Sequence, residues 1–128
     1  MPPIDFASFL KKTRASSSSK KSNLDREQYL YLTTRGRRSG LPREIEIWFV
    51  SLAGRYYVIA EYPTSNWVRN IRAHPEVRVR VANEEFSGKA RVLAERSEAL
   101  QRKIQALSRE KYGWGEGLVV EIVPDRAN

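Results

Sequence analysis

The sequence contains no cysteine, one histidine and one methionine in 128 residues. Without cysteine the chain cannot form disulfides, a thiol nucleophile or a thiolate metal site, and the redox compartment stays undecided. The single histidine, His74, cannot build a metal cluster, and its position before Pro75 favours an interpretation as a helix-end residue. Serine nucleophiles are also disfavoured, because no activating base accompanies them apart from that histidine.

Long apolar runs are missing as well. No run approaches the ~18 residues of a membrane-spanning helix, and the N-terminus lacks the pattern of a cleaved leader, so we predict a cytoplasmic protein. A length of 128 residues with 41% hydrophobic content favours one domain with its own core. The net charge is +8, which indicates an anionic partner: nucleic acid, anionic lipid or a phosphorylated small molecule.

The basic charge is concentrated in residues 33–43, which hold four arginines, two glycines, three hydroxyl side chains and no acid. Strand-like runs flank this stretch, so it should form a turn between two strands. Glycine exposes backbone N–H groups, and each guanidinium offers a fork of donors that matches phosphate oxygens. We therefore predict an anion site here, with a solvated basic hairpin as the alternative.

The periodicity divides the chain into an N-terminal helix with a Ser/Lys-rich linker (1–22) and a β-barrel domain (23–128). The helix could dock on the barrel, on a second subunit or on a membrane, or it could fray. The domain should be mainly β with flanking helices, a six-stranded antiparallel barrel or strongly curled sheet. The expected strands are Tyr29–Thr34, Arg43–Leu52, Arg55–Glu61, Val77–Val81, Glu85–Ala94 and Gly117–Val123, and the expected helices are 66–73 and 97 to about 113.

Trp48, Trp67, Trp114 and the tyrosines have two interpretations: they could pack in the core, or they could stack on a flat ring at an open barrel mouth. Trp67 opens a helix beside Ser65 and Asn70, a mixture of apolar surface and polar donors that suits a site for a flat ring, although aromatic residues usually pack in the core. Tyr112 and Trp114 lie in a glycine-rich connection, where they could form a lid or cover the edge of the core.

The combination of basic and aromatic residues is also typical of single-stranded nucleic-acid binding on a small barrel. However, the arginines gather at one turn instead of following a groove, and Glu76, Glu84 and Glu85 interrupt any extension through Arg78 or Arg80. Nucleic acid is therefore the disfavoured partner.

Two linked motifs resemble the deazaflavin-dependent nitroreductase family. They are Leu32-Thr33-Thr34-x-Gly36-Arg37-x-Ser39-Gly40-x-Pro42-Arg43 and Asn66-Trp67-x-x-Asn70-Ile71-x-Ala73-x-Pro75-x-Val77-x-Val79. Members of that family are split β-barrels of the FMN-binding type, related to flavin reductases and pyridoxamine-phosphate-oxidase-like proteins. The resemblance implies coenzyme F-420, a deazaflavin with a phosphate-bearing oligoglutamate tail. It further implies hydride transfer to an enone, quinone or nitro compound, and a homodimer.

The resemblance also implies roles for individual residues. The cofactor-binding residues would be Arg37, Arg38, Ser39 and Arg43 at the tail, and Ala60, Glu61, Trp67 and Asn70 at the ring, while Tyr112 and Ser65 would be catalytic and no metal is implied. The loop after the third strand is short and carries an acid where relatives have a longer, Lys- and Gly-rich loop. FMN therefore stays open as an alternative cofactor. A non-catalytic barrel that binds a flavin, an anion or a lipid stays open as an alternative function.

Overall fold

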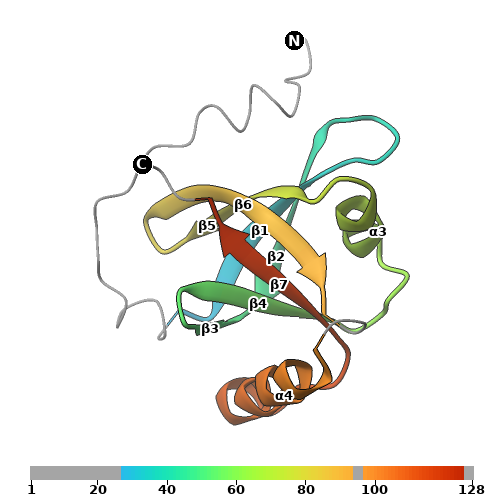
Figure 1. The fold of residues 1–128 in the computed structure, drawn as a ribbon. Coiled ribbons are helices and arrows are strands. Elements are labelled where there is room, and N and C mark those ends of the chain that lie inside the picture. The colour runs from blue at the N-terminus through green and yellow to red at the C-terminus, as the bar shows by residue number, and fades with distance from the viewer. Residues whose placement is uncertain (1–26, 94–96, 126–128) are drawn as a thin grey trace.

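The computed structural model describes residues 27–93 and 97–125; the predicted N-terminal helix and linker lie outside these ranges. The described part folds into one curled antiparallel sheet with two helices beside it (Figure 1). Its elements are β1 (Tyr29–Arg35), β2 (Pro42–Trp48), β3 (Val50–Leu52), β4 (Arg55–Ala60), α3 (Asn66–Ala73), β5 (Glu76–Val81), β6 (Glu84–Val92), α4 (Glu98–Tyr112) and β7 (Leu118–Pro124).

The predicted mainly-β, antiparallel fold class is confirmed, but the described sheet has seven strands and not six. The strand order is β2-β1-β5-β6-β7-β4-β3. The predicted strand Arg43–Leu52 is divided at Phe49 into β2, which pairs with β1, and β3, which pairs with β4. Because β2 and β3 are the two edges of the sheet, Phe49 connects these edges through the chain itself, and the sheet closes into a split barrel.

Tyr112, the last residue of α4, explains why the strand is interrupted. The Phe49 N–H donates to the Tyr112 hydroxyl oxygen at 3.1 Å, and the Phe49 carbonyl accepts from that hydroxyl at 2.8 Å and from Lys111 Nζ at 3.1 Å. The hydroxyl also lies 2.8 Å from the carbonyl oxygen of Gln28. Side chains thus satisfy the Phe49 backbone where a neighbouring strand would otherwise do so.

We expect Tyr112→Phe to lower the free energy of unfolding by about 1–3 kcal/mol, because it leaves the Phe49 N–H without its partner. Urea denaturation of the variant and of wild-type protein measures this difference. Tyr31→Phe is the control, since this half-exposed tyrosine faces Glu46 and does not contact the barrel closure. Equal losses in the two variants would contradict a closing role for the Tyr112 hydroxyl.

Local sequence explains the hairpins and the helix ends. Ala53 and Gly54 have φ of 54° and 78°, which is the geometry of a two-residue turn that matches strand twist. The turn predicted at Asn83-Glu84 begins one residue earlier, with Ala82 at φ 55°. Helix α4 begins after Ser97, whose Oγ accepts from the Leu100 N–H at 3.3 Å, and it is capped after Tyr112 by Gly113 in the left-handed conformation; both ends lie where the sequence predicts them.

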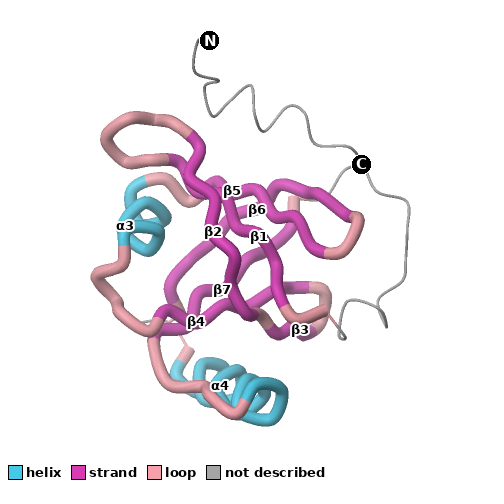
Figure 2. The backbone as a smooth tube through the Cα atoms, turned by 180° about the vertical axis from the view of Figure 1, so that it is seen from behind, coloured by secondary structure: helices cyan, strands magenta, loops and turns pink. Residues whose placement is uncertain are grey.

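Two apolar clusters position the helices. The barrel interior is filled by buried residues of β1, β4, β5, β6 and β7, among them Leu32, Val58 and Val79, while β2 adds the partly buried Ile45 and Ile47. A second cluster lies between α4 and the outer face of β4 and β7, centred on Ile104 and Val119. Figures 1 and 2 both show α4 against one end of the barrel and α3 beside the loop that joins β1 to β2.

Candidate functional site

The turn between β1 and β2 is ordered by its glycines. The Gly36 N–H donates to the Leu41 carbonyl at 2.8 Å, and the Gly40 N–H donates to the Gly36 carbonyl at 2.8 Å. Gly40 has φ of 73°, which favours glycine, and a Cβ at Gly36 would lie 2.6 Å from Ser39 Oγ and 3.2 Å from the Leu41 carbonyl oxygen, so the turn packs closely around Gly36. We call residues 35–43 the arginine hairpin; its loop projects beside α3 (Figure 1).

Asn70 of α3 fastens the arginine hairpin to the barrel. Its buried amide donates to Thr34 Oγ1 at 3.0 Å, and its Oδ1 accepts from the Arg37 backbone N–H at 3.2 Å and from the Arg37 guanidinium at 2.9 Å. Asn66 Oδ1 accepts from the same guanidinium at 3.2 Å. These amides are neutral, so they orient Arg37 without cancelling its charge.

The arginines of the hairpin differ from those on the rest of the barrel. Elsewhere, Arg78 pairs with Glu85 and Arg80 with Glu44, while Arg55 and Arg91 share Glu121. Within residues 27–93 and 97–125, by contrast, none of Arg35, Arg37, Arg38 and Arg43 forms an ion pair. Four neighbouring cations without a carboxylate produce a strong local positive potential, and this donor set fits a phosphate or carboxylate ligand.

The hairpin and α3 enclose a cleft of about 470 Å³, which we call the arginine cleft. Its lining brings together six of the residues predicted to bind the cofactor, and the full set is Gly36, Arg37, Arg38, Ser39, Arg43, Ile45, Asn66, Trp67 and Asn70. Ser39 Oγ accepts from the Leu41 N–H at 3.1 Å, which leaves its own proton able to donate to a ligand.

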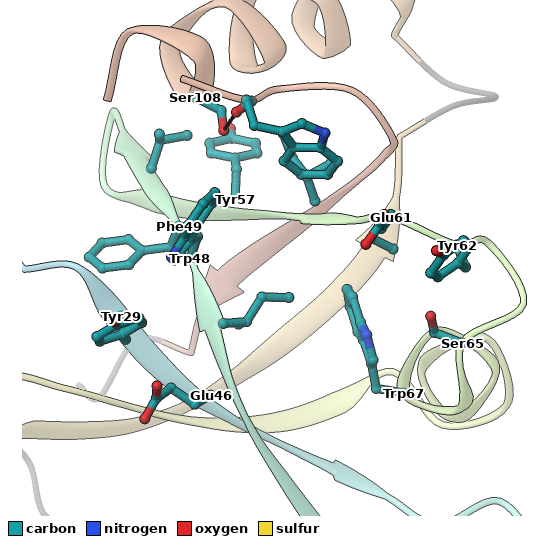
Figure 3. Close-up of a pocket in the computed structure, with 15 residues that line it drawn as sticks. Tyr29, Glu46, Trp48, Phe49, Tyr57, Glu61, Tyr62, Ser65, Trp67 and Ser108 are labelled. Atoms are coloured by element: carbon teal, nitrogen blue, oxygen red, sulfur yellow. Dashed lines mark hydrogen bonds between the residues drawn. The ribbon is translucent and has the colours of Figure 1, made fainter. Parts of the chain in front are cut away.

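A larger cavity of about 650 Å³, the aromatic cavity, opens between β2 and β4 (Figure 3). Trp67 lines both spaces, so the arginine cleft and the aromatic cavity adjoin at this ring. The aromatic cavity is lined by Tyr29, Glu46, Ile47, Trp48, Phe49, Val50, Tyr57, Ile59, Ala60, Glu61, Tyr62, Ser65, Trp67, Ser108 and Trp114. Ser65 stands at the N-terminus of α3 and its side chain makes no capping hydrogen bond, so its hydroxyl is available to the cavity.

The sequence left the tryptophans and tyrosines open to ring stacking or core packing, and it gave a cofactor-binding role to Trp67 alone among the aromatic residues that line this cavity. Trp48 lies on the outward face of β2, two residues from Glu46, where an exposed tryptophan needs a reason. Tyr29 faces it across the β1–β2 pair and is also exposed. An alternating strand with Glu, Glu and Trp on its polar face was the available signal for a ring-binding surface.

Tyr112 does not line the aromatic cavity. Its ring stacks on Trp48 at 4.5 Å between centroids and 3° between planes, and its hydroxyl is engaged at Phe49 and Gln28. Burial raises the pKa of this hydroxyl, although the hydrogen bond to the Phe49 backbone opposes the rise. The catalytic role of Tyr112 stays a prediction. In the structure its ring packs against Trp48, which lines the aromatic cavity.

A buried carboxylate connects the cavity wall to the outer face of the sheet. Glu121 is fully buried and accepts from the Tyr57 hydroxyl at 2.9 Å, from Arg55 at 3.2 Å and from Arg91 at 2.7 Å. Burial acts to raise the pKa of Glu121, but the hydrogen bonds from Tyr57, Arg91 and Arg55 outweigh it, so that the pKa is lowered from 4.5. Burial first, and then the hydrogen bond to Glu121, raise the pKa of Tyr57 to about 12.

These shifts predict the pH dependence of stability. Since the folded pKa of Tyr57 lies above its ordinary value of 10, its contribution is complete below pH 10 and is lost as the pH rises toward 12. Because the pKa of Glu121 is lowered, its contribution to stability is complete above pH 4.5 and is lost as the pH falls below that value. Tyr57→Phe should therefore reduce the loss of stability between pH 10 and pH 12 by on the order of 2 kcal/mol. Urea denaturation across this pH range measures the difference. An unchanged alkaline slope would contradict the assignment.

The curled sheet that closes through Phe49, with an aromatic cavity at its split and a cationic cleft beside it, defines a split β-barrel. A family model described as F420H(2)-dependent quinone reductase matches residues 7–115. The chain belongs to this family, which is a family of oxidoreductases, and the resemblance seen in the sequence motifs is confirmed.

Solved structures support the fold. One described as an F420-H2 dependent reductase has 21% identity and a TM-score of 0.63, and the match covers 74% of this chain and 93% of that one. An F420 reductase has 19% identity, a TM-score of 0.64, and coverage of 87% and 97%. The heme storage protein HutZ from Vibrio cholerae has 19% identity, a TM-score of 0.69, and coverage of 84% and 88%.

No curated protein matches the sequence significantly. In the part of the chain that the structure describes, no cluster of His, Asp and Glu could hold a metal ion. In the same part, neither helix has the length and apolar character needed to cross a membrane.

Proposed function

We propose that the protein is a reductase that holds the acidic tail of coenzyme F-420 in the arginine cleft and its deazaflavin ring in the aromatic cavity. The single observation that carries the proposal is the adjoining of the two spaces at Trp67. One space supplies guanidinium groups that form no ion pair with a described residue, and the other supplies flat apolar walls. A molecule that is a polyanion at one end and a planar ring at the other matches this arrangement.

Named residues would hold each part of the cofactor. Arg37, Arg38 and Arg43 would bind the phosphate and the tail carboxylates, with Ser39 donating from its hydroxyl. Trp67 and Ala60 would contact the ring. Asn70 has its amide engaged by the hairpin, so it would act as a positioning residue for Arg37.

The charges of the two spaces also orient the cofactor. Glu46 and Glu61 line the aromatic cavity, and no basic residue of the described ranges does, so an acidic tail is repelled there and attracted to the arginine cleft. When bound and reduced, the deazaflavin supplies a hydride to an electron-poor acceptor: an enone, quinone or nitro compound. Ser65 is the hydroxyl best placed to donate a proton to the product, since it lines the cavity and is not used in capping.

A fluorescence titration tests this proposal against its rivals. Trp48, Trp67 and Trp114 all line the aromatic cavity, so a bound ring should quench their emission. The purified protein would be titrated with F-420, with FMN and with a single-stranded oligonucleotide. We expect saturable quenching by F-420 at micromolar concentration and oxidation of reduced F-420 by a quinone.

Quenching by FMN alone would make FMN the cofactor. Binding of F-420 without reductase activity would favour a non-catalytic barrel. Quenching only by the oligonucleotide, steeply weakened by salt, would replace the proposal with nucleic-acid binding.

Three further expectations stay predictions: a cytoplasmic location, a homodimer, and peripheral membrane contact through residues 1–22, which lie outside the described residues. Analytical ultracentrifugation checks the homodimer, since a 14.8 kDa chain should sediment as a particle of twice that mass. Flotation with anionic vesicles checks the membrane contact; a chain lacking residues 1–22 should fail to float.

A further inference from the structure

Among the described residues, the aromatic cavity is lined by acidic side chains and by no lysine, arginine or histidine. Glu61 follows β4, and Glu46 lies on β2; Figure 3 shows them on different sides of the cavity. Neither carboxylate forms an ion pair with a lysine or arginine of the described ranges. Lys111 is bonded to the Phe49 carbonyl and lies 4.1 Å from the Phe49 ring centroid, but it is not a lining residue.

We propose that Glu61, assisted by Glu46, selects the acceptor by charge, so that the site favours cationic and neutral flat acceptors over anionic ones. This inference rests on the proposed function, because hydride transfer requires ring and acceptor to be in contact inside the same cavity. Once the cofactor tail neutralises the arginine cleft, these two carboxylates are the charged groups that the described lining residues present to an acceptor. An anionic substituent is repelled, and a cationic one is attracted both by the carboxylates and by the faces of the aromatic walls.

The two carboxylates should contribute unequally. Glu46 interacts with the Tyr31 hydroxyl, and this hydrogen bond raises the pKa of Tyr31. Glu61 is exposed just after a buried strand and lies beside Tyr62 and Ser65 on the Trp67 side of the cavity (Figure 3). Glu61 should therefore dominate, and both effects should weaken as salt concentration rises.

Steady-state kinetics with matched quinones test the selection. Three naphthoquinones would be compared at saturating reduced F-420: one with a sulfonate, one uncharged and one with a trimethylammonium group. We expect kcat/KM to favour the cationic over the anionic quinone by about ten-fold at low salt. The preference should fall about three-fold in Glu61→Gln, less in Glu46→Gln, and nearly vanish in the double variant. Glu44→Gln is the control: it removes the same charge from the same strand outside the cavity and should change nothing.

An equilibrium readout separates this inference from the proposed function. The cofactor-free protein would be titrated with a naphthyl-trimethylammonium ion and with a neutral naphthalene of similar shape, by tryptophan fluorescence. Glu61→Gln should weaken binding of the cation about three-fold and leave the neutral probe unchanged. If F-420 binds but the probes and quinones show no charge preference, the charge selection is overturned while the proposed function stands. If the cation effect is present but F-420 does not bind, the proposed function fails and the charged cavity remains.

Discussion

Replacing Arg37 and Arg43 together with alanine should weaken binding of F-420 by at least about 100-fold, because two charge-assisted contacts are each worth about 1.5–3 kcal/mol. Both guanidinium groups line the arginine cleft, and neither has a carboxylate partner among the described residues. Tryptophan quenching measures the affinity. The residual binding should also depend less steeply on salt, since two of the cations that produce this dependence are gone and Arg38 remains.

The fold should survive this change. Arg43 is exposed, and Arg37 is half-exposed with only neutral side-chain partners, so the loss of stability should stay below about 2 kcal/mol. Arg72→Ala with Arg102→Ala is the matched control, because it removes the same charge from exposed helix positions that do not line the cleft. If both double variants keep wild-type affinity, the arginine hairpin does not hold the tail.

Glu121→Ala should destabilise the protein by about 2–4 kcal/mol, the largest loss we expect from a single polar residue outside the two cavities. The substitution leaves the buried Tyr57 hydroxyl without its acceptor and removes the carboxylate shared by Arg55 and Arg91. Those arginines are about half exposed, so water can solvate them again, and this holds the loss below that of a fully buried pair. Urea denaturation measures the change.

Glu44→Ala provides the comparison, because Glu44 pairs with Arg80 at 3.6 Å and both side chains are exposed. Its loss should be below about 1 kcal/mol. Glu121→Gln should fall between the two, since the amide oxygen can still accept from Tyr57 while the charge is gone. Equal losses for Glu121→Ala and Glu44→Ala would show that the buried network adds no stability beyond a surface pair.

The sequence predicted the hairpin because its signals are local. Gly36 and Gly40 mark a tight turn, alternating runs flank it, and the pairing of Thr34 with Arg43 follows from them. Helix ends at Ser97 and Gly113 were predictable for the same reason, since a capping hydroxyl and a left-handed glycine act within one turn.

The closure of the barrel could not be predicted in this way. Residues 43–52 alternate as one continuous strand, and nothing within them indicates a break at Phe49. The break depends on the hydroxyl of Tyr112, which is 63 residues away in sequence. The hydrogen bond from Arg37 to Asn70 joins residues 33 positions apart, and local sequence could not predict it either. Such contacts become visible only when the tertiary structure brings the segments together.

The two parts of the candidate site also differ in how far local sequence predicts them. Residues of the arginine cleft come mainly from two short motifs, so sequence reasoning could collect them. The aromatic cavity is assembled from four strands (β1 to β4), the loop after β4, α3, α4 and the loop after α4, and apart from Trp67 its residues lie outside the two motifs. Exposed Trp48 and Tyr29 were the clearest local indication of it.

One comparison tests most directly whether the arginine cleft and the aromatic cavity act as a single binding site. The affinity of the wild-type protein would be measured for F-420 and for a deazaflavin that has the same ring but lacks the phosphate and the tail. Our account predicts that the tail-less ring binds at least about 100-fold more weakly, and equally well to wild-type protein and to the Arg37/Arg43 double variant. Equal affinity of wild-type protein for the two ligands would contradict it.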